Sequence, residues 1–128
     1  MRYRYGSSYV HVLPGGNPDP GESLCDALCR ELSEELGIMV TVRSMVLAGE
    51  VLHFNGREDT LHCVFRADIT DGDPGLDRVN TSAEAIEWIS ASRLGSVNLY
   101  PNFGARLAGE IPEAFCYTGP LQQPYVGD

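Results

Sequence analysis

A loop rich in glycine and proline, residues 13–21, leads directly into an amphipathic segment at residues 23–36. The loop holds three glycines and three prolines, so its backbone must bend tightly and then stay rigid. The segment opens with Ser23 and Asp26, a pair typical of a helix N-cap, and Gly37 after it is typical of a helix end. We therefore predict a strand, a rigid loop and a helix in direct succession.

The predicted helix has two distinct faces. At about 100° per residue, leucines and cysteines share one broad arc, the kind of face that a globular domain buries. Glutamates gather on an adjoining arc roughly 100° wide by the same geometry. The apolar set is Leu24, Cys25, Leu28, Cys29, Leu32 and Leu36, and the acidic set is Glu31, Glu34 and Glu35.

The acidic face needs a counter-charge. Each like-charge pair on one helical turn costs about 0.2–0.5 kcal/mol when exposed and more when partly buried. A divalent cation would compensate, and an all-oxygen carboxylate set suits Mg²⁺ or Mn²⁺ better than zinc. The alternative is a solvated acidic face, which explains most glutamate runs.

The whole stretch resembles the Nudix box, with every fixed position filled. The resemblance implies an α/β fold, namely an α/β/α sandwich with a mixed sheet, in a single domain over residues 1–128. It also implies a Mg²⁺- or Mn²⁺-dependent hydrolase that cleaves the diphosphate linkage of a nucleoside diphosphate derivative by attack of water on phosphorus. The matching residues are Gly16, Glu22, Arg30, Glu31, Leu32, Glu34, Glu35, Gly37 and Ile38.

The resemblance also implies roles for individual residues. The carbonyl of Gly16 would be a metal ligand, and Glu34 and Glu35 the principal metal-binding carboxylates. Arg30 would orient Glu31, which would serve either as the general base or as a further ligand, since Nudix enzymes differ on this. Glu22 resembles a supporting glutamate that reaches the metal in some members.

A second point of resemblance lies at residues 84–89, where an acidic residue precedes a tryptophan in a predicted short strand, residues 85–89. In many Nudix proteins such a residue hangs over the metal site as a late ligand or base, and Glu84 is the candidate here. The alternative is a loop glutamate that only caps or is solvated. We predict that Trp88 packs in the core and that Glu87 lies on the exposed side of the strand.

Composition limits the possible partners. A formal charge of −9 and a pI near 4.6 argue against nucleic-acid binding through phosphate neutralisation. No apolar run is long enough to span a membrane, and we expect a cytoplasmic location. The cysteines Cys25 and Cys29 could form half of a zinc site with His62 or Cys63, but reduced thiols in the core are the favoured interpretation.

The rest of the chain alternates in the manner of a mixed sheet. Strands are expected at residues 8–13, at 39–46 and 47–54 as one bent strand or two, and at 61–69, with a hairpin turn at Asn55-Gly56. A second helix is expected at residues 102–109, and the tail from about residue 111 to 128 should be extended or irregular.

Only twelve residues precede Leu13, whereas Nudix domains usually carry a full strand and a turn before the strand that leads to the loop. The first strand of that pair is expected to be missing. Either the start is misassigned, or another chain covers the exposed sheet edge, which favours a homodimer.

The substrate stays open between nucleoside triphosphates, oxidised nucleoside triphosphates, ADP-ribose and nucleotide sugars. A non-hydrolytic nucleotide-binding or regulatory protein is the alternative function. Such proteins commonly lose one of the box carboxylates, and none is lost here.

Overall fold

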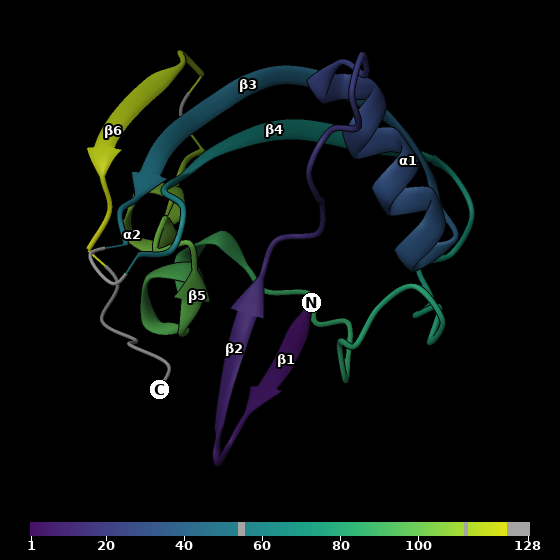
Figure 1. Ribbon diagram of the computed structural model, residues 1–128, viewed down its shortest axis with the longest axis horizontal. Helices are drawn as coiled ribbons and strands as arrows, with labels where there is room; N and C mark the ends of the chain where they lie inside the picture. Colours follow the sequence, from purple (N-terminus) through teal and green to yellow (C-terminus); the bar gives the residue numbers. More distant parts are fainter. Residues whose placement is uncertain (54–55, 112, 123–128) are drawn as a thin grey trace. The chain divides into compact units, whose positions relative to one another are not determined.

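The computed structural model describes residues 1–53, 56–111 and 113–122. The predicted α/β class is confirmed, because the strands make up two three-stranded sheets and are accompanied by few helices (Figure 1). The chain divides into two compact units. The first unit comprises Met1–Arg43 and Ala67–Glu87, and the second comprises Ser44–Arg66 and Trp88–Asp128.

The first unit begins with a β-hairpin. Strand β1 (Arg2–Tyr5) pairs antiparallel with β2 (Ser8–Val12), and Arg2 lies opposite His11 in the register. Gly6 turns the chain with a φ of 59°, which glycine adopts at little steric cost. The predicted strand at residues 8–13 is thus confirmed, and it feeds directly into the glycine-rich loop.

Helix α1 (Leu24–Leu36) begins and ends where its caps predict. The Ser23 hydroxyl accepts the backbone N–H of Asp26 at 3.1 Å and donates to the Asp26 carboxylate at 2.7 Å. Gly37 adopts the left-handed conformation with a φ of 67°, as a C-terminal cap requires. The local sequence therefore determines both ends of the acidic helix.

The buried stripe of α1 is narrower than the predicted arc. Leu32 and Leu36 are buried, but Leu24 is 45% exposed and Cys25 is exposed as well. The row Leu28, Leu32 and Leu36 follows the four-residue spacing, and Leu24 extends it only into the exposed first turn. The core thiol predicted at Cys25 is therefore wrong. Partly buried side chains complete the cluster around Leu32, Leu36 and Ile38, namely Met1, Leu28, Val40, Leu76 and Ile86.

The long strands β3 (Met39–Val51) and β4 (Thr60–Asp71) each contribute residues to both units. The segment predicted as one bent strand or two is one strand up to Val51. The alternation predicted for residues 61–69 is incomplete, since Leu61 and Ile69, near the strand's two ends, are 60% and 44% exposed. Phe54 and Asn55, from the predicted strand end and hairpin turn, lie outside the described residues.

The second unit contains a strand within the tail that was predicted to be extended or irregular. Strand β6 (Cys116–Pro120) pairs parallel with β3, with Leu47 opposite Cys116. Its hydrogen-bonding partner lies far away in the sequence, so local pattern gave no indication of it. Val46, Leu47 and Phe103 are the largest fully buried side chains of this unit.

The predicted helix at residues 102–109 is much shorter in the structure. Helix α2 (Gly104–Leu107) is a single turn, preceded by a 3₁₀ helix (Ala91–Ser96) and strand β5 (Leu99–Tyr100). A Cβ on Gly104 would lie 2.4 Å from the Leu94 carbonyl oxygen, so close backbone approach requires glycine there.

The predicted strand at residues 85–89 is wrong. Ala85 makes one isolated bridge to Arg2, and the residues after it extend no ladder. A single bridge cannot maintain a strand, because each further residue would need its own partner. Trp88, which was predicted to pack in the core, is 79% exposed.

Candidate active site

The glycine-rich loop and helix α1 meet where Gly16 faces Glu31. A Cβ built on Gly16 would lie 2.3 Å from both the carboxyl carbon and Oε1 of Glu31. Only a residue without a side chain leaves room for the carboxylate at this point. The Glu31 side chain is 19% exposed, so it is largely enclosed beside the loop backbone.

Arg30 joins the loop to three carboxylates. Its Nε and Nη2 donate to the two oxygens of Glu22 at 2.9 and 3.0 Å. Its Nη1 donates to Glu31 at 3.0 Å and to Glu34 at 3.2 Å, and Nη2 also donates to the Asn17 carbonyl at 3.2 Å. All five N–H donors of the guanidinium are thereby used.

The electrostatics of this network follow from the contacts. Hydrogen bonds to Glu22, and next to Glu31, raise the pKa of the Arg30 guanidinium above its ordinary value. The same guanidinium lowers the pKa of Glu22, and the backbone N–H of Asp19, which donates at 2.8 Å, lowers it further. Glu22 is therefore held ionised as the anchor of Arg30.

Glu35 is the carboxylate that lacks a full set of partners. Its Oε2 is buried and has no hydrogen-bond partner among the described residues. Burial raises the pKa of the Glu35 carboxyl, and the negative charge of Glu31 raises it further, whereas a hydrogen bond from Thr81 opposes the rise. A buried acceptor beside like charges is an environment that a cation would stabilise.

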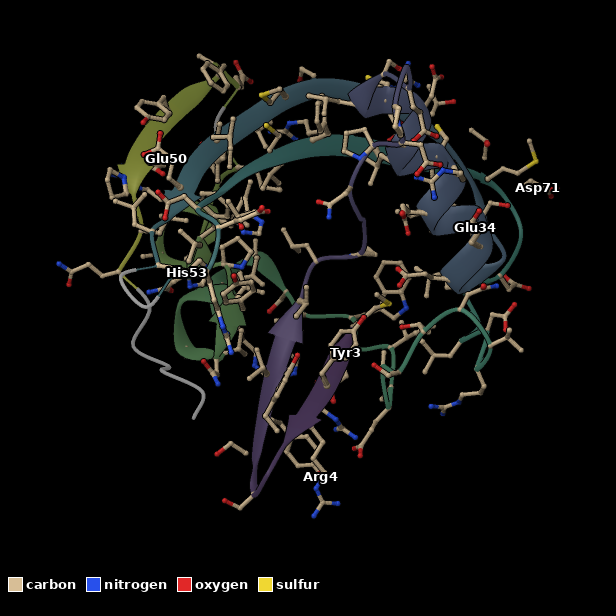
Figure 2. The ribbon with its side chains drawn as sticks, in the orientation of Figure 1. Tyr3, Arg4, Glu34, Glu50, His53 and Asp71 are labelled. Carbon is tan, nitrogen blue, oxygen red and sulfur yellow. The ribbon has the colours of Figure 1, made fainter. Side chains whose placement is uncertain are left out.

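Glu34 is the most exposed of the three glutamates on the acidic face. Its side chain is 48% exposed, and Figure 2 shows it on α1. In the described part of the chain, no three histidine, cysteine or acidic side chains are grouped closely enough to hold a metal ion. The donor set nonetheless fits Mg²⁺ or Mn²⁺, because it consists of oxygens and includes the unpartnered Oε2 of Glu35.

A loop for which no role was predicted, residues 75–80, donates hydrogen bonds to the carboxyl end of α1. The last four carbonyls of a helix have no partner within it. Here each accepts a hydrogen bond, and three of the four donors come from residues 75–80. The pairs are Gly37 N–H to Ser33 at 3.0 Å, Asn80 Nδ2 to Glu34 at 3.2 Å, Asp77 N–H to Glu35 at 2.9 Å and Gly75 N–H to Leu36 at 3.0 Å.

Glu84 lies on the exposed side of a segment that is tied to β1. Its backbone N–H donates to the Arg2 carbonyl at 2.8 Å, and its carbonyl accepts from Arg78 at 3.3 Å. Arg78 also donates to the Ala83 carbonyl at 2.7 Å. Hydrogen bonds thus hold the backbone at Glu84 on both sides. These contacts do not involve the carboxylate of Glu84, so its role as a late ligand or base stays a prediction.

Glu87 forms an ion-pair cluster that the sequence did not reveal. It accepts from Arg2 at 2.5 Å and from His11 at 2.8 Å, and its side chain is 33% exposed. The hydrogen bond with His11 is the main cause of a lowered pKa for the Glu87 carboxyl. No local pattern indicated this cluster, because Glu87 and His11 are 76 positions apart in the sequence.

A family model described as NUDIX domain matches residues 2–108. The chain belongs to the Nudix family. The predicted resemblance is confirmed, and it extends well beyond the box to most of the chain. A Nudix domain thus includes the hairpin, the glycine-rich loop, α1 and the segment that carries Glu84.

Curated relatives of this Nudix chain carry related names. The chain is 32% identical over 97 residues to "Putative 8-oxo-dGTP diphosphatase 3" of Mycobacterium tuberculosis, an alignment that covers 73% of this chain and 43% of the relative. It is 34% identical over 82 residues to "Putative 8-oxo-dGTP diphosphatase" of Bacillus subtilis, covering 64% and 51%. The chain spans about half the length of the curated relatives it matches.

The structure brings together most of the residues that the Nudix box singled out. Gly16, Glu22, Arg30, Glu31 and Glu34 form one contact network, and Glu35 lies beside it on the same helix. The cysteines do not form a zinc site within the described residues, where all four thiols are free. No helix in the described part of this Nudix chain is both long and apolar enough to cross a membrane.

Proposed function

We propose that the chain is a divalent-metal-dependent hydrolase, on a Nudix-type α/β/α sandwich, that cleaves a diphosphate linkage in a nucleoside diphosphate derivative. The single observation that carries the proposal is the network around Arg30, in which loop and helix carboxylates converge beside the Gly16 backbone. Membership of the Nudix family, with every box carboxylate present, supports hydrolysis over binding alone.

The residues divide into ligands and supports. Glu34, Glu35 and the Gly16 carbonyl would hold Mg²⁺ or Mn²⁺, with Glu31 either as a further ligand or as the proton acceptor. When bound, the cation supplies charge neutralisation of the phosphate oxygens and a lower pKa for the attacking water.

The supporting residues hold the carboxylate side chains in position. Glu22 holds the Arg30 guanidinium through both of its oxygens, and Arg30 in turn fixes Oε1 of Glu31. Glu31 is thereby presented with one oxygen bound to Arg30 and the other available to accept a proton. Glu84 is a second candidate for the proton acceptor, on the segment tied to β1.

We propose an oxidised purine nucleoside triphosphate, 8-oxo-dGTP, as the first substrate to test, because the names of the relatives support it. Water would attack one phosphorus of the triphosphate, its oxygen forming a new P–O bond as a bridging P–O bond breaks and the bridging oxygen leaves on the other phosphate fragment. The proton of the water passes to a carboxylate. The alternative substrates remain nucleoside triphosphates, ADP-ribose and nucleotide sugars.

The test is a substrate panel with Mg²⁺ or Mn²⁺, scored by release of phosphate, pyrophosphate and nucleotide. We expect hydrolysis by the wild-type protein that falls by about a hundredfold or more in Glu34→Gln and in Glu35→Gln. Glu113→Gln, an exposed carboxylate of the second unit, is the matched control and should keep full activity. Full activity in both active-site variants, or nucleotide binding without any turnover by the wild type, would contradict the proposal.

A further inference from the structure

Strand β4 lies at the edge of its sheet. It neighbours β3 in the order β4-β3-β6, and no other strand of the described residues pairs with its second edge. From Arg66 to Asp71 every residue is exposed, on both faces of the strand. An exposed row of backbone N–H and C=O groups is a template for pairing with another strand. The sheet could therefore be extended at β4.

Apolar side chains of this strand are also uncovered. Ile69 is 44% exposed, and Leu61, near the other end, is 60% exposed. Both lie on one face, because residues an even number of positions apart share a face of a strand. Removing such apolar surface from water favours association. The strand thus offers a partner both hydrogen-bonding groups and apolar surface.

A second copy of the chain is a suitable partner because of the order of the charges along β4. Two copies related by a two-fold axis would pair this strand antiparallel with itself, and the residue at the axis would lie opposite its own copy. With Ala67 at the axis, Arg66 lies opposite the partner's Asp68 on one face. On the other face, Phe65 lies opposite the partner's Ile69. Symmetry makes each contact twice, and opposite charges directly across a strand pair stabilise it.

Other positions of the axis are less favourable. Three residues in the exposed stretch 66–71 are charged, and an axis at any of them would place that residue against its own copy. Like charges directly opposite each other destabilise a strand pair. An axis at Ile69 or Thr70 would bring no oppositely charged residues together. Within this stretch, only an axis at Ala67 therefore pairs opposite charges.

The contacts within one chain are compatible with this register. Asp68 accepts a hydrogen bond from Arg43 at 2.7 Å, and both side chains are more than half exposed, so a second cation can approach Asp68. Arg66 donates through Nη2 to the Ile111 carbonyl at 2.8 Å. A guanidinium has five N–H donors, so this contact does not prevent an ion pair. Asp68 would lie between Arg43 of its own chain and the partner's Arg66.

We propose that β4 pairs with β4 of a second copy around Ala67, so that the protein is a homodimer joined through an extended sheet. The inference goes beyond the proposed hydrolysis, and its tests need no substrate. Each chain carries a formal charge of −9, so two copies repel each other over a distance. The tests therefore use about 0.15 M salt, which screens exposed charges more than about 8 Å apart.

The first test is a disulfide across the two-fold axis. Residues directly opposite each other in an antiparallel pair have Cα atoms about 4.5–5.5 Å apart, which a disulfide can span. Ala67→Cys is made together with Cys25→Ser, because the Cys25 thiol is exposed. Mild oxidation should give a covalent dimer as the main product on non-reducing electrophoresis. Cys25→Ser alone should give little.

Thr70→Cys in the same background is the matched control. Residue 70 would lie opposite the partner's Val64, so its two copies would be about 20 Å apart along the strands. A disulfide cannot span that distance. We expect little covalent dimer from this variant, and equal cross-linking at residues 67 and 70 would contradict the register.

The second test reverses the charges and measures the dissociation constant of the dimer by analytical ultracentrifugation. Arg66→Asp replaces two ion pairs by two like-charge contacts, so the dissociation constant should rise by about tenfold or more. Adding Asp68→Arg exchanges the two charges and should restore most of the affinity. Arg106→Asp, at an exposed position of α2, changes the net charge equally and should leave the dissociation constant near the wild-type value.

Circular dichroism shows whether each variant is folded, and the cross-link at residue 67 tests the proposal even if a charge variant is not. A wild-type protein that is monomeric at micromolar concentrations would overturn the proposal and leave the edge of β4 to a different strand. A dimer that neither cross-links at residue 67 nor responds to Arg66→Asp would use another surface, which also contradicts it. Hydrolysis by a monomer would leave the proposed function intact.

Discussion

Gly16 and Glu31 approach each other so closely that a Cβ on the glycine would overlap the carboxylate, at 2.3 Å from its carbon. We expect Gly16→Ala to displace Glu31 and to lower kcat/KM by about ten- to a hundredfold, because small misplacements of catalytic groups are costly. The free energy of unfolding should change little, since the carboxylate is the end of a flexible side chain. Steady-state kinetics and thermal unfolding together check this.

Gly75→Ala is the control for that substitution, because nothing lies within 4 Å of a Cβ at Gly75. It should leave both kcat/KM and unfolding near their wild-type values. Equal activity in the two alanine variants would show that the approach of Gly16 to Glu31 has no part in the reaction.

Arg30→Lys tests whether activity requires the several N–H donors of the planar guanidinium or only its positive charge. Lysine keeps the charge but cannot donate to both oxygens of Glu22 while reaching Glu31 and Glu34. We expect kcat/KM to fall by about ten- to a hundredfold. Arg43→Lys should have almost no effect, since its pair with Asp68 is largely exposed. A variant at Arg30 with wild-type kinetics would mean that charge alone suffices.

Ser23→Ala should lower the free energy of unfolding by about 1 kcal/mol, because it removes the acceptor for the Asp26 N–H. Chemical denaturation measures the change. Ser33→Ala, at an exposed position inside the same helix, serves as the control and should be neutral or slightly stabilising. If both substitutions had the same effect, the cap would contribute nothing beyond helix propensity.

The lowered pKa of Glu87 predicts that the stability of the fold depends on pH. Its pKa is lowered in the folded protein by His11 and Arg2, so its contribution is fully present above the unfolded value of about 4.3. The contribution is lost as the pH falls through the lower, folded pKa. The difference in unfolding free energy between the wild type and Glu87→Gln should therefore be positive at pH 7 and shrink below about pH 4.

Urea denaturation from pH 7 to pH 2 would show this narrowing. Glu110→Gln, an exposed carboxylate of the second unit, should show a small difference that does not follow the same course. A difference at Glu87 that is constant across the whole range would mean that the ion pair with Arg2 and the hydrogen bond with His11 do not stabilise the fold.

The acidic helix α1 could be predicted from the sequence because its determinants are local. Ser23 and Gly37 fix its ends, and the spacing of Leu28, Leu32 and Leu36 fixes its buried side. The contact of Arg30 with Glu34 follows from that register, since residues four positions apart lie on the same side of a helix.

The parts of the fold and site that could not be predicted depend on partners far away in the sequence. Strand β6 exists because β3 offers it a parallel neighbour, and residues 85–89 fail to form a strand because only one bridge to Arg2 is available. The pairing of His11 with Glu87 is separated by 76 positions. Hydrophobic pattern carries no information about such pairings, which depend on tertiary contact.

The loop at residues 75–80, which donates hydrogen bonds to the carboxyl end of α1, also affects the order in which this protein reaches its final structure during synthesis. The Asn80 amide reaches the Glu34 carbonyl across a separation of 46 positions. A nascent chain that has emerged only as far as α1 would carry Glu31, Glu34 and Glu35 on a helix whose last three carbonyls still face water. Because domains acquire distant contacts after local ones, the acidic helix would gain its final geometry only when the downstream segment leaves the ribosome.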